Sequence, residues 1–125
     1  MIIGIGTDIV EVDRFDEFLR TNNERLLQRL FSPQELSYCR SASNVGHKLA
    51  ARFAAKEAFL KALGTGFSNG VRWHDMEVRR SASGAPSLAL AGKALSLANE
   101  RCIRIIHLSL SHEKTHALAF VILES

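Results

Sequence analysis

The feature that most constrains the fold is one long helical pattern over residues 45–63, which are rich in Ala, Leu, Lys and Glu. Gly64 follows at the position where a left-handed C-cap is expected. In projection at about 100° per residue, one arc about 80° wide holds the apolar residues Val45, Leu49, Phe53, Leu60 and Leu63. Lys56 falls inside this arc and Glu57 lies at its edge. The helix is therefore expected to pack on a sheet while carrying two charges close to that contact.

Strand and helix patterns account for most of the remaining chain. Apolar, often β-branched residues predict strands at 2–12, 76–79, 86–90, 105–111 and 117–123. Capping residues and helical spacing predict helices at 13–21, 24–30, 32–40 and 92–101. The pattern is typical of a single α+β domain over residues 1–125, with a mostly antiparallel sheet packed on the one long helix.

Composition limits the class of protein. The chain has 125 residues, of which 46% are hydrophobic and 23% charged; this suits one globular core and excludes disordered and fibrous proteins. No apolar stretch approaches the roughly 20 residues that cross a bilayer, and no charged lead-in precedes an apolar signal region, so a cytoplasmic protein without a membrane partner is expected. Cys39 and Cys102 have no CxxC spacing and are expected to be reduced packing residues.

The charge balance is mildly basic. A net charge of +3 and a pI near 9.2 favour anionic partners without naming them. A basic nucleic-acid-binding module is one alternative that the arginine clusters support. Trp73 and Tyr38 are too isolated for a base-stacking platform, however, and the sequence has no zinc-finger or basic-helix pattern.

Asp8 is an unusual charge in the apolar first strand. If this strand packs under the long helix, Asp8 and Glu57 converge as two hard oxygen ligands. Mg²⁺ accepts one or two carboxylates, keeps several waters and completes its shell with substrate phosphate. The sequence therefore predicts a magnesium and phosphate site. The alternative for Glu57 is an i, i+4 pair with Lys61 on a solvated flank.

Basic residues accompany the two carboxylates. Lys48, Arg52 and Lys56 recur at i, i+4 spacing, which a phosphate-binding wall requires, although such a stripe is more often a solvated face. Gly4-Ile5-Gly6 lacks the third glycine of a dinucleotide fingerprint and lies within the strand, which excludes that motif. Of the five histidines, His112 is the one expected to project from a sheet end into a site.

Two blocks of the sequence match a known family. The start, Gly4-Ile5-Gly6-Thr7-Asp8-Ile9, and the run Arg-Phe-Ala-Ala-Lys-Glu-Ala-Phe-Leu-Lys-Ala-Leu-Gly-Thr-Gly at 52–66 closely resemble the holo-[acyl-carrier-protein] synthase class of the 4′-phosphopantetheinyl transferase superfamily. The likeness extends through residues 25–32 with Glu35-Leu36, the Gly84-Ala85-Pro86 turn, and residues 109–112 with 117–119, so it covers nearly the full chain.

The resemblance implies a reaction and a set of site residues. The 4′-phosphopantetheine arm of coenzyme A would pass to a serine of an acyl carrier protein in fatty acid biosynthesis, with release of adenosine 3′,5′-bisphosphate. The Mg²⁺ ligands would be Asp8 and Glu57, and Lys61 would stabilise charge at the pyrophosphate. The positions near the coenzyme would be Arg52, Lys56, Gly64, Thr65, Gly66 and His112. The general base stays open among a metal-bound water, Glu57 and another carboxylate.

The same resemblance implies partners. Arg14, Arg25 and Arg29 would form the surface that faces the carrier, which suits an acidic protein steered by charge. The chain would assemble as a homotrimer with each active site between neighbouring subunits, which would cover apolar sheet surface. A second enzymatic interpretation, a Mg²⁺-dependent phosphohydrolase of a small nucleotide, uses the same carboxylates with water as the acceptor.

Overall fold

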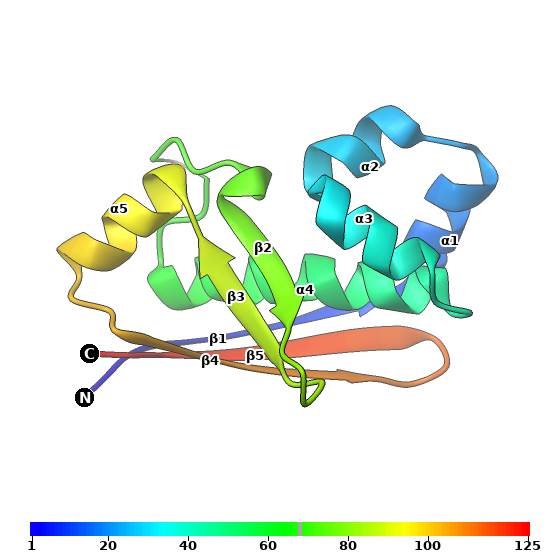
Figure 1. Cartoon of the computed structure of the whole chain (residues 1–125). Helices are drawn as coiled ribbons and strands as arrows, with labels where there is room; N and C mark the ends of the chain where they lie inside the picture. The colour runs from blue at the N-terminus through cyan, green and yellow to red at the C-terminus, as the bar shows by residue number, and fades with distance from the viewer. Residues whose placement is uncertain (68) are drawn as a thin grey trace.

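Helix α4 (Val45–Leu63) runs through the middle of the molecule, as Figure 1 shows. The structure is a computed structural model that describes residues 1–67 and 69–125. A three-stranded sheet covers one side of α4 and the N-terminal helices lie on the other, while a two-stranded hairpin crosses the helix and reaches the edge of the sheet. Ala54 and Ala58 are fully buried. Their small side chains let neighbouring elements approach the helix closely. Helix α4 is thus buried on most of its circumference, beyond the single apolar face that the sequence predicts.

The other helices and the hairpin strands confirm the predicted positions to within a residue. They are α1 (Val12–Arg20), α2 (Glu24–Leu30), α3 (Pro33–Arg40), β2 (Met76–Arg80), β3 (Pro86–Leu90) and α5 (Gly92–Glu100). Helix α3 begins with a capping box, in which Ser32 and Glu35 each accept a hydrogen bond from the other's backbone amide. A short 3-10 helix, η1 (Trp73–Asp75), precedes β2 and is not among the predicted elements.

The larger sheet pairs the two ends of the chain. Strands β1 (Ile2–Glu11), β5 (His116–Glu124) and β4 (Ile105–His112) are antiparallel in the order β1-β5-β4. Strands β2 and β3 pair separately as a two-stranded antiparallel sheet. The antiparallel arrangement is confirmed, but the strands are divided between two sheets: the hairpin crosses α4, with β2 beside α3 and α4 and β3 beside β4, and does not extend the larger sheet (Figure 1).

The two faces of the larger sheet differ in their surroundings. The inner face packs on α4 through fully buried residues of β5, namely Ala117, Ala119, Val121 and Leu123. The outer face carries large apolar side chains that stay exposed, among them Ile5, Ile9, Leu118 and Phe120. An exposed apolar sheet face is a typical contact surface for another protein chain.

Two further expectations concern membranes and thiols. Among the described residues, no helix is both long and apolar enough to cross a membrane.

Cys39 is buried, and burial raises the pKa of its thiol to about 11. Cys102 is exposed after α5, with a backbone φ of 58°. The predicted packing role is therefore confirmed for Cys39 and wrong for Cys102.

Candidate active site

Two glycines of β1 set the distance between this strand and α4. A Cβ at Gly4 would lie 2.1 Å from the Ala62 carbonyl oxygen, and one at Gly6 would lie 1.9 Å from that of Ala58. Only glycine therefore lets the strand rest directly on the helix backbone. Asp8 follows on the same face of β1, because side chains of a strand alternate between faces. The Gly4-Ile5-Gly6 motif thus brings Asp8 alongside the C-terminal half of α4.

Asp8 meets Lys61 across this contact. The ammonium of Lys61 donates to Asp8 Oδ1 at 2.9 Å and to the Thr7 carbonyl oxygen at 3.1 Å. The side chain of Asp8 is 15% exposed and that of Lys61 is 54% exposed, so the pair borders solvent. Within the described residues Lys61 forms its ion pair with Asp8, and the alternative pairing with Glu57 is not present.

Glu57 lies one helical turn before Lys61 and is half-buried. Burial raises the pKa of its carboxyl group, and the negative charge of Asp8 raises it further. The positive charges of Lys61 and Arg14 act in the opposite direction. The influence of Asp8 on Glu57 shows that the two carboxylates share one electrostatic environment. Like charges held together in this way repel, and a bound cation relieves the repulsion.

A hollow of about 350 Å³ opens beside these groups. It is lined by Glu57, Leu60, Lys61, Gly64, Gly66 and Phe67. Gly64 ends α4 in the left-handed region with a φ of 80°, and its amide donates to the Leu60 carbonyl, which confirms the predicted C-cap. Thr65 lies between the two glycines in the same turn. The turn therefore brings backbone close to the hollow without bulky side chains at Gly64 and Gly66.

The donor set suits Mg²⁺. The described residues contain no group of three or more His, Cys, Asp and Glu side chains that could hold a metal ion. Structural zinc needs four protein ligands and Ca²⁺ takes six to eight oxygens, so a pair of carboxylates is a poor site for either. Mg²⁺ is bound through one or two carboxylates with waters and substrate phosphates. Asp8 and Glu57 are the residues that could supply such a pair.

Lys56 does not belong to an exposed phosphate-binding wall. Its side chain is fully buried, and its ammonium lies 2.7 Å from Glu35 Oε1 and 2.7 Å from the Leu30 carbonyl oxygen. Burial lowers the pKa of the ammonium, whereas Glu35 raises it. The prediction that Lys56 approaches the nucleotide is therefore wrong, because the ammonium points into the core to neutralise a buried carboxylate. Its position inside the apolar arc of α4 was the sequence signal for this burial.

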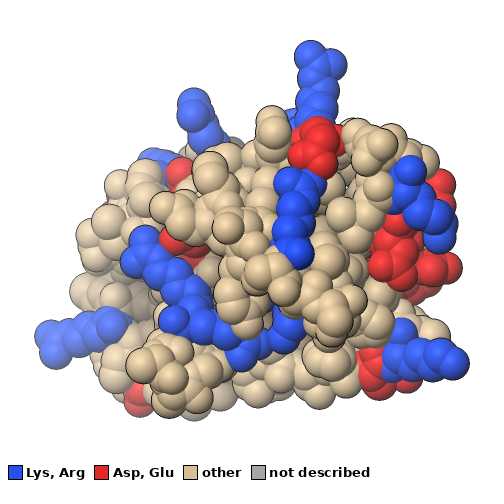
Figure 2. All heavy atoms as spheres, turned by 45° about the vertical axis from the view of Figure 1, so that its right-hand side comes forward, with Lys and Arg blue, Asp and Glu red and all other residues tan. Residues whose placement is uncertain are grey.

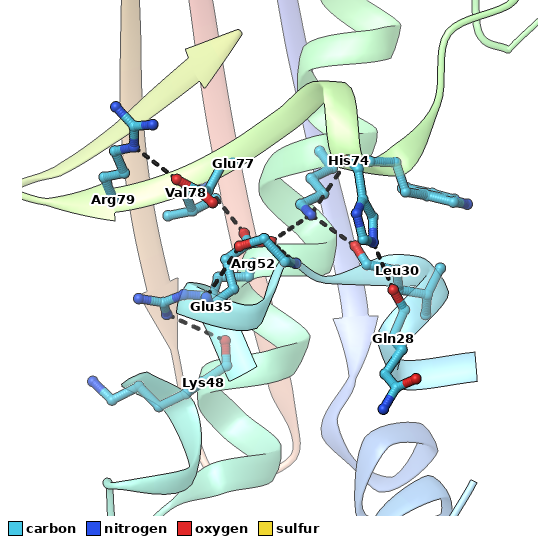
Figure 3. Close-up of polar contacts among 12 residues, drawn as sticks. Gln28, Leu30, Glu35, Lys48, Arg52, His74, Glu77, Val78 and Arg79 are labelled. Atoms are coloured by element: carbon cyan, nitrogen blue, oxygen red, sulfur yellow. Dashed lines mark hydrogen bonds and ion pairs between the residues drawn. The ribbon is translucent and has the colours of Figure 1, made fainter. Parts of the chain in front are cut away.

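Arg52 lies one turn before Lys56 and is 1% exposed. Its guanidinium stacks on the ring of Tyr38 at 4.4 Å and donates to the Lys48 carbonyl oxygen at 3.5 Å, a contact visible in Figure 3. In the described part of the chain, its Nε has no hydrogen-bond partner. Lys61 is nine residues further on, about 13 Å along the helix axis. Arg52 and the Asp8–Lys61 pair thus lie toward opposite ends of α4.

His112 ends β4 and contacts the ring of His47 edge-on, with 5.5 Å between the ring centroids. Its strand partner is Ala117, whereas that of Asp8 is Ala119, and β5 separates the two outer strands. The backbones of His112 and Asp8 are therefore two strand spacings apart, about 10 Å, and offset along the strands. A single chain does not bring His112 together with Asp8, Glu57 and Lys61.

The three predicted carrier-facing arginines are exposed, Arg14 on α1 and Arg25 and Arg29 on α2. The guanidinium of Arg14 lies 5.3 Å from the centre of the Phe53 ring. Its charge also lowers the pKa of Glu57, which places α1 near the site. Figure 2, which turns the α1–α3 end of the molecule forward, shows Lys and Arg side chains scattered over this face, with Asp and Glu grouped at its right-hand side.

Sequence reasoning missed an aromatic cluster beside the site, formed by Phe53, Trp73 and Phe67. The rings of Phe53 and Trp73 lie 5.1 Å apart, and those of Trp73 and Phe67 lie 4.4 Å apart. Phe67 lines the hollow beside Glu57 and also a second hollow of about 660 Å³ that Arg29 borders. No local pattern identifies this cluster, because its members come from α4, the turn after it and η1.

Comparisons with known proteins agree with this geometry. Residues 4–121 match the sequence model of the 4′-phosphopantetheinyl transferase superfamily. A holo-[acyl-carrier-protein] synthase of Trichlorobacter lovleyi is 52% identical over 100% of this chain and 99% of the relative. The crystal structure of the synthase from Neisseria meningitidis aligns with a TM-score of 0.88 and 39% identity over 100% of both chains. That from Bacillus anthracis, in complex with CoA (3′,5′-ADP), aligns with a TM-score of 0.81 and 37% identity over 100% of this chain and 98% of the other.

Proposed function

The chain belongs to the 4′-phosphopantetheinyl transferase superfamily, and from this premise we propose how its residues carry out the reaction. The reaction is transfer of the phosphopantetheine moiety of coenzyme A to an apo acyl carrier protein. A serine of the carrier is the acceptor, adenosine 3′,5′-bisphosphate is the second product, and the pathway served is fatty acid biosynthesis. The observation that carries the assignment is that Glu57 and Lys61 line one hollow while Asp8 forms an ion pair with Lys61 at its border.

Asp8 and Glu57 would hold Mg²⁺ at the pyrophosphate of coenzyme A. When bound there, the ion neutralises charge that develops on the phosphate oxygens during phosphoryl transfer. The surroundings of Glu57 support this role. Its carboxylate is half-buried beside a second carboxylate, so a bound cation is energetically favourable there.

Lys61 would stabilise charge directly. Its ammonium has three hydrogens and uses two of them on Asp8 and the Thr7 carbonyl. The third can reach a phosphate oxygen in the hollow that Lys61 lines. Asp8 thereby orients Lys61, while the backbone of Gly64, Thr65 and Gly66 forms the opposite border of the phosphate position.

The nucleotide end of coenzyme A would contact a neighbouring subunit. Arg52 and His112 both lie near the N-terminal half of α4, since His112 contacts His47 on that half. Asp8, Glu57 and Lys61 lie at the other half. Each chain thus carries two separate half-sites, and a homotrimer would complete each active site between two chains. The unpartnered Nε of buried Arg52 supports an anionic ligand there.

The outer face of the larger sheet would form the trimer contact. Ile9 is 62% exposed, Ile5 57% and Phe120 40%, all on this face. Burial of such a surface stabilises association by roughly 25 cal/mol per Å² of apolar area. A symmetric assembly covers this face in every subunit at once.

The acyl carrier protein would dock on α1 and α2. Arg14, Arg25 and Arg29 present positive charge without an ion pair within the described chain, which suits an acidic partner. Arg14 lies close enough to Glu57 to lower the pKa of its carboxyl group. A carrier docked on these helices would therefore bring its serine toward the proposed Mg²⁺ position.

The nucleotide product distinguishes this function from the phosphohydrolase alternative. Chromatography of a reaction with coenzyme A and Mg²⁺ should show adenosine 3′,5′-bisphosphate only when apo acyl carrier protein is added. Release of phosphate or of a nucleotide without any carrier would favour the hydrolase instead, since water would then be the acceptor.

A further inference from the structure

The buried pair of Glu35 and Lys56 joins four elements around α4. Glu35 is 2% exposed; its Oε1 accepts from the Ser32 amide at 2.9 Å, and its Oε2 accepts from the Val78 amide at 2.9 Å. The same Oε1 accepts from Lys56 at 2.7 Å. Figure 3 shows Glu35 between Val78 of β2 on one side and Leu30 of α2 on the other. Both carboxylate oxygens are therefore fully used inside the core.

The ammonium of Lys56 makes two further contacts, both with main-chain carbonyls. It donates to Leu30 at 2.7 Å and to Trp73 at 3.5 Å. Leu30 is the last residue of α2, the helix that carries Arg25 and Arg29. Trp73 belongs to η1 and packs on Phe67, which lines the hollow beside Glu57.

A buried ion pair of this kind fixes geometry more effectively than it adds stability. Desolvation of both charges offsets much of their attraction, so a buried pair is weak support for the free energy of unfolding. Its hydrogen bonds, by contrast, hold four chain segments at set distances in a medium of low dielectric constant. Lys56 also directly precedes Glu57 on α4, so the same stretch of helix carries both a member of the buried ion pair and the proposed metal ligand.

We propose that the Glu35–Lys56 pair is a positioning device: it holds the docking helix α2 and η1 at a fixed distance from Glu57 and Lys61. This inference rests on the proposed function, since it takes α2 to be the carrier-docking helix. The pair contacts no substrate. It fixes the distance between the docked carrier and the phosphates of coenzyme A, and a displacement of about 1 Å in such a geometry can cost about 100-fold in rate.

The variants Glu35→Gln and Glu35→Gln/Lys56→Met test this role. The glutamine amide keeps an acceptor for the Ser32 amide, and the methionine fills the volume of the lysine stem without leaving an unpaired charge. Two quantities are measured on folded protein: the kcat of the transfer reaction at saturating apo carrier, and the Kd for coenzyme A by calorimetry without carrier. Val121→Ala serves as the control, because it opens a cavity in the core of β5, away from the pair.

A positioning role lowers the kcat of transfer about 100-fold in the double variant, because the carrier still docks but its serine is displaced, and it leaves the Kd for coenzyme A unchanged. In the control, both quantities stay near those of the wild type once the folded fraction is equal. The inference is overturned if coenzyme A binding weakens as much as kcat falls, because Lys56 then acts on the coenzyme. It is also overturned if a folded variant keeps the wild-type kcat. Failure of the proposed function is distinct, since the wild-type protein would then transfer no arm. Lys56→Met alone, in which Glu35 keeps both backbone amide donors, decides the matter if the double variant does not fold.

Discussion

The ammonium of Lys61 lies 2.9 Å from Asp8 Oδ1, although 53 residues separate them in the sequence. The contact depends on the close approach of β1 to α4, which Gly4 and Gly6 permit. It leaves Lys61 oriented toward the hollow that Glu57 also lines. One strand and one helix thus supply both carboxylates and the lysine of the candidate site.

Glu57→Gln should lower transfer activity by about 100-fold or more, because it removes one of the two proposed carboxylate ligands. The same substitution should raise the stability of the metal-free protein at neutral pH. The folded protein raises the pKa of Glu57 above its ordinary value of 4.5, so the stabilising contribution of this group is complete below that value and is lost as pH rises through the folded pKa. At neutral pH without metal, the variant should therefore melt at a higher temperature than the wild type. A lower Tm with unchanged activity would contradict both parts.

Gly6→Ala should displace β1 from α4. The new Cβ would lie 1.9 Å from the Ala58 carbonyl oxygen, so a backbone shift is unavoidable, at a cost of about 1–3 kcal/mol or more. Activity should fall as well, because Asp8 moves with the strand. Gly84→Ala is the control: its φ of 88° is strained, but open space surrounds the position, so thermal denaturation should show a loss of only about 1 kcal/mol. Equal stability of Gly6→Ala and wild type would contradict the packing argument.

Arg14→Glu should raise the KM for the carrier about tenfold and weaken its salt dependence. Coenzyme A binding, measured by calorimetry, should change little. The reversed charge should also move the acidic limb of the activity profile to higher pH, since Arg14 now lowers the pKa of Glu57. Arg104→Glu, an exposed arginine next to β4, is the matched control and should keep the wild-type KM. Equal losses in both variants would point to net charge alone.

Ile9→Glu should dissociate the proposed trimer into folded, inactive monomers. The side chain is 62% exposed on the outer sheet face, so the charge is tolerated in a single chain but not in an apolar interface. Sedimentation measures the mass, and circular dichroism checks the fold. Leu95→Glu, at a 43% exposed position on α5, is the control and should stay assembled. An active monomer of either the wild type or Ile9→Glu would contradict the shared active site.

Much of the fold follows from local sequence patterns. The helix at 45–63 ends where Gly64 predicts, and the capping box of Ser32 and Glu35 starts α3 as expected. The division of the strands between two sheets does not follow from such patterns, because it depends on how the hairpin packs against α4 and β4.

The site was partly predictable from charges in apolar surroundings. Asp8 in an apolar strand and Glu57 at the edge of the apolar arc both pointed to a shared position, and the influence of Asp8 on the pKa of Glu57 agrees. Lys56 is the instructive failure. Its i, i+4 spacing from Arg52 suggested a wall of cations, but the carboxylate that neutralises it, Glu35, lies 21 residues earlier on another helix. Spacing along one helix cannot identify such a partner.

The most direct test of the account is intact-protein mass spectrometry of an apo acyl carrier protein incubated with this protein, coenzyme A and Mg²⁺. The account predicts a mass gain of one phosphopantetheine arm on the carrier. The gain should disappear with a chelator, and it should be strongly reduced with Asp8→Asn in place of the wild type. A carrier of unchanged mass, with the protein folded and the carrier shown to be competent with another transferase, would contradict the account. A full gain in the presence of the chelator would contradict the metal-binding role of Asp8 and Glu57.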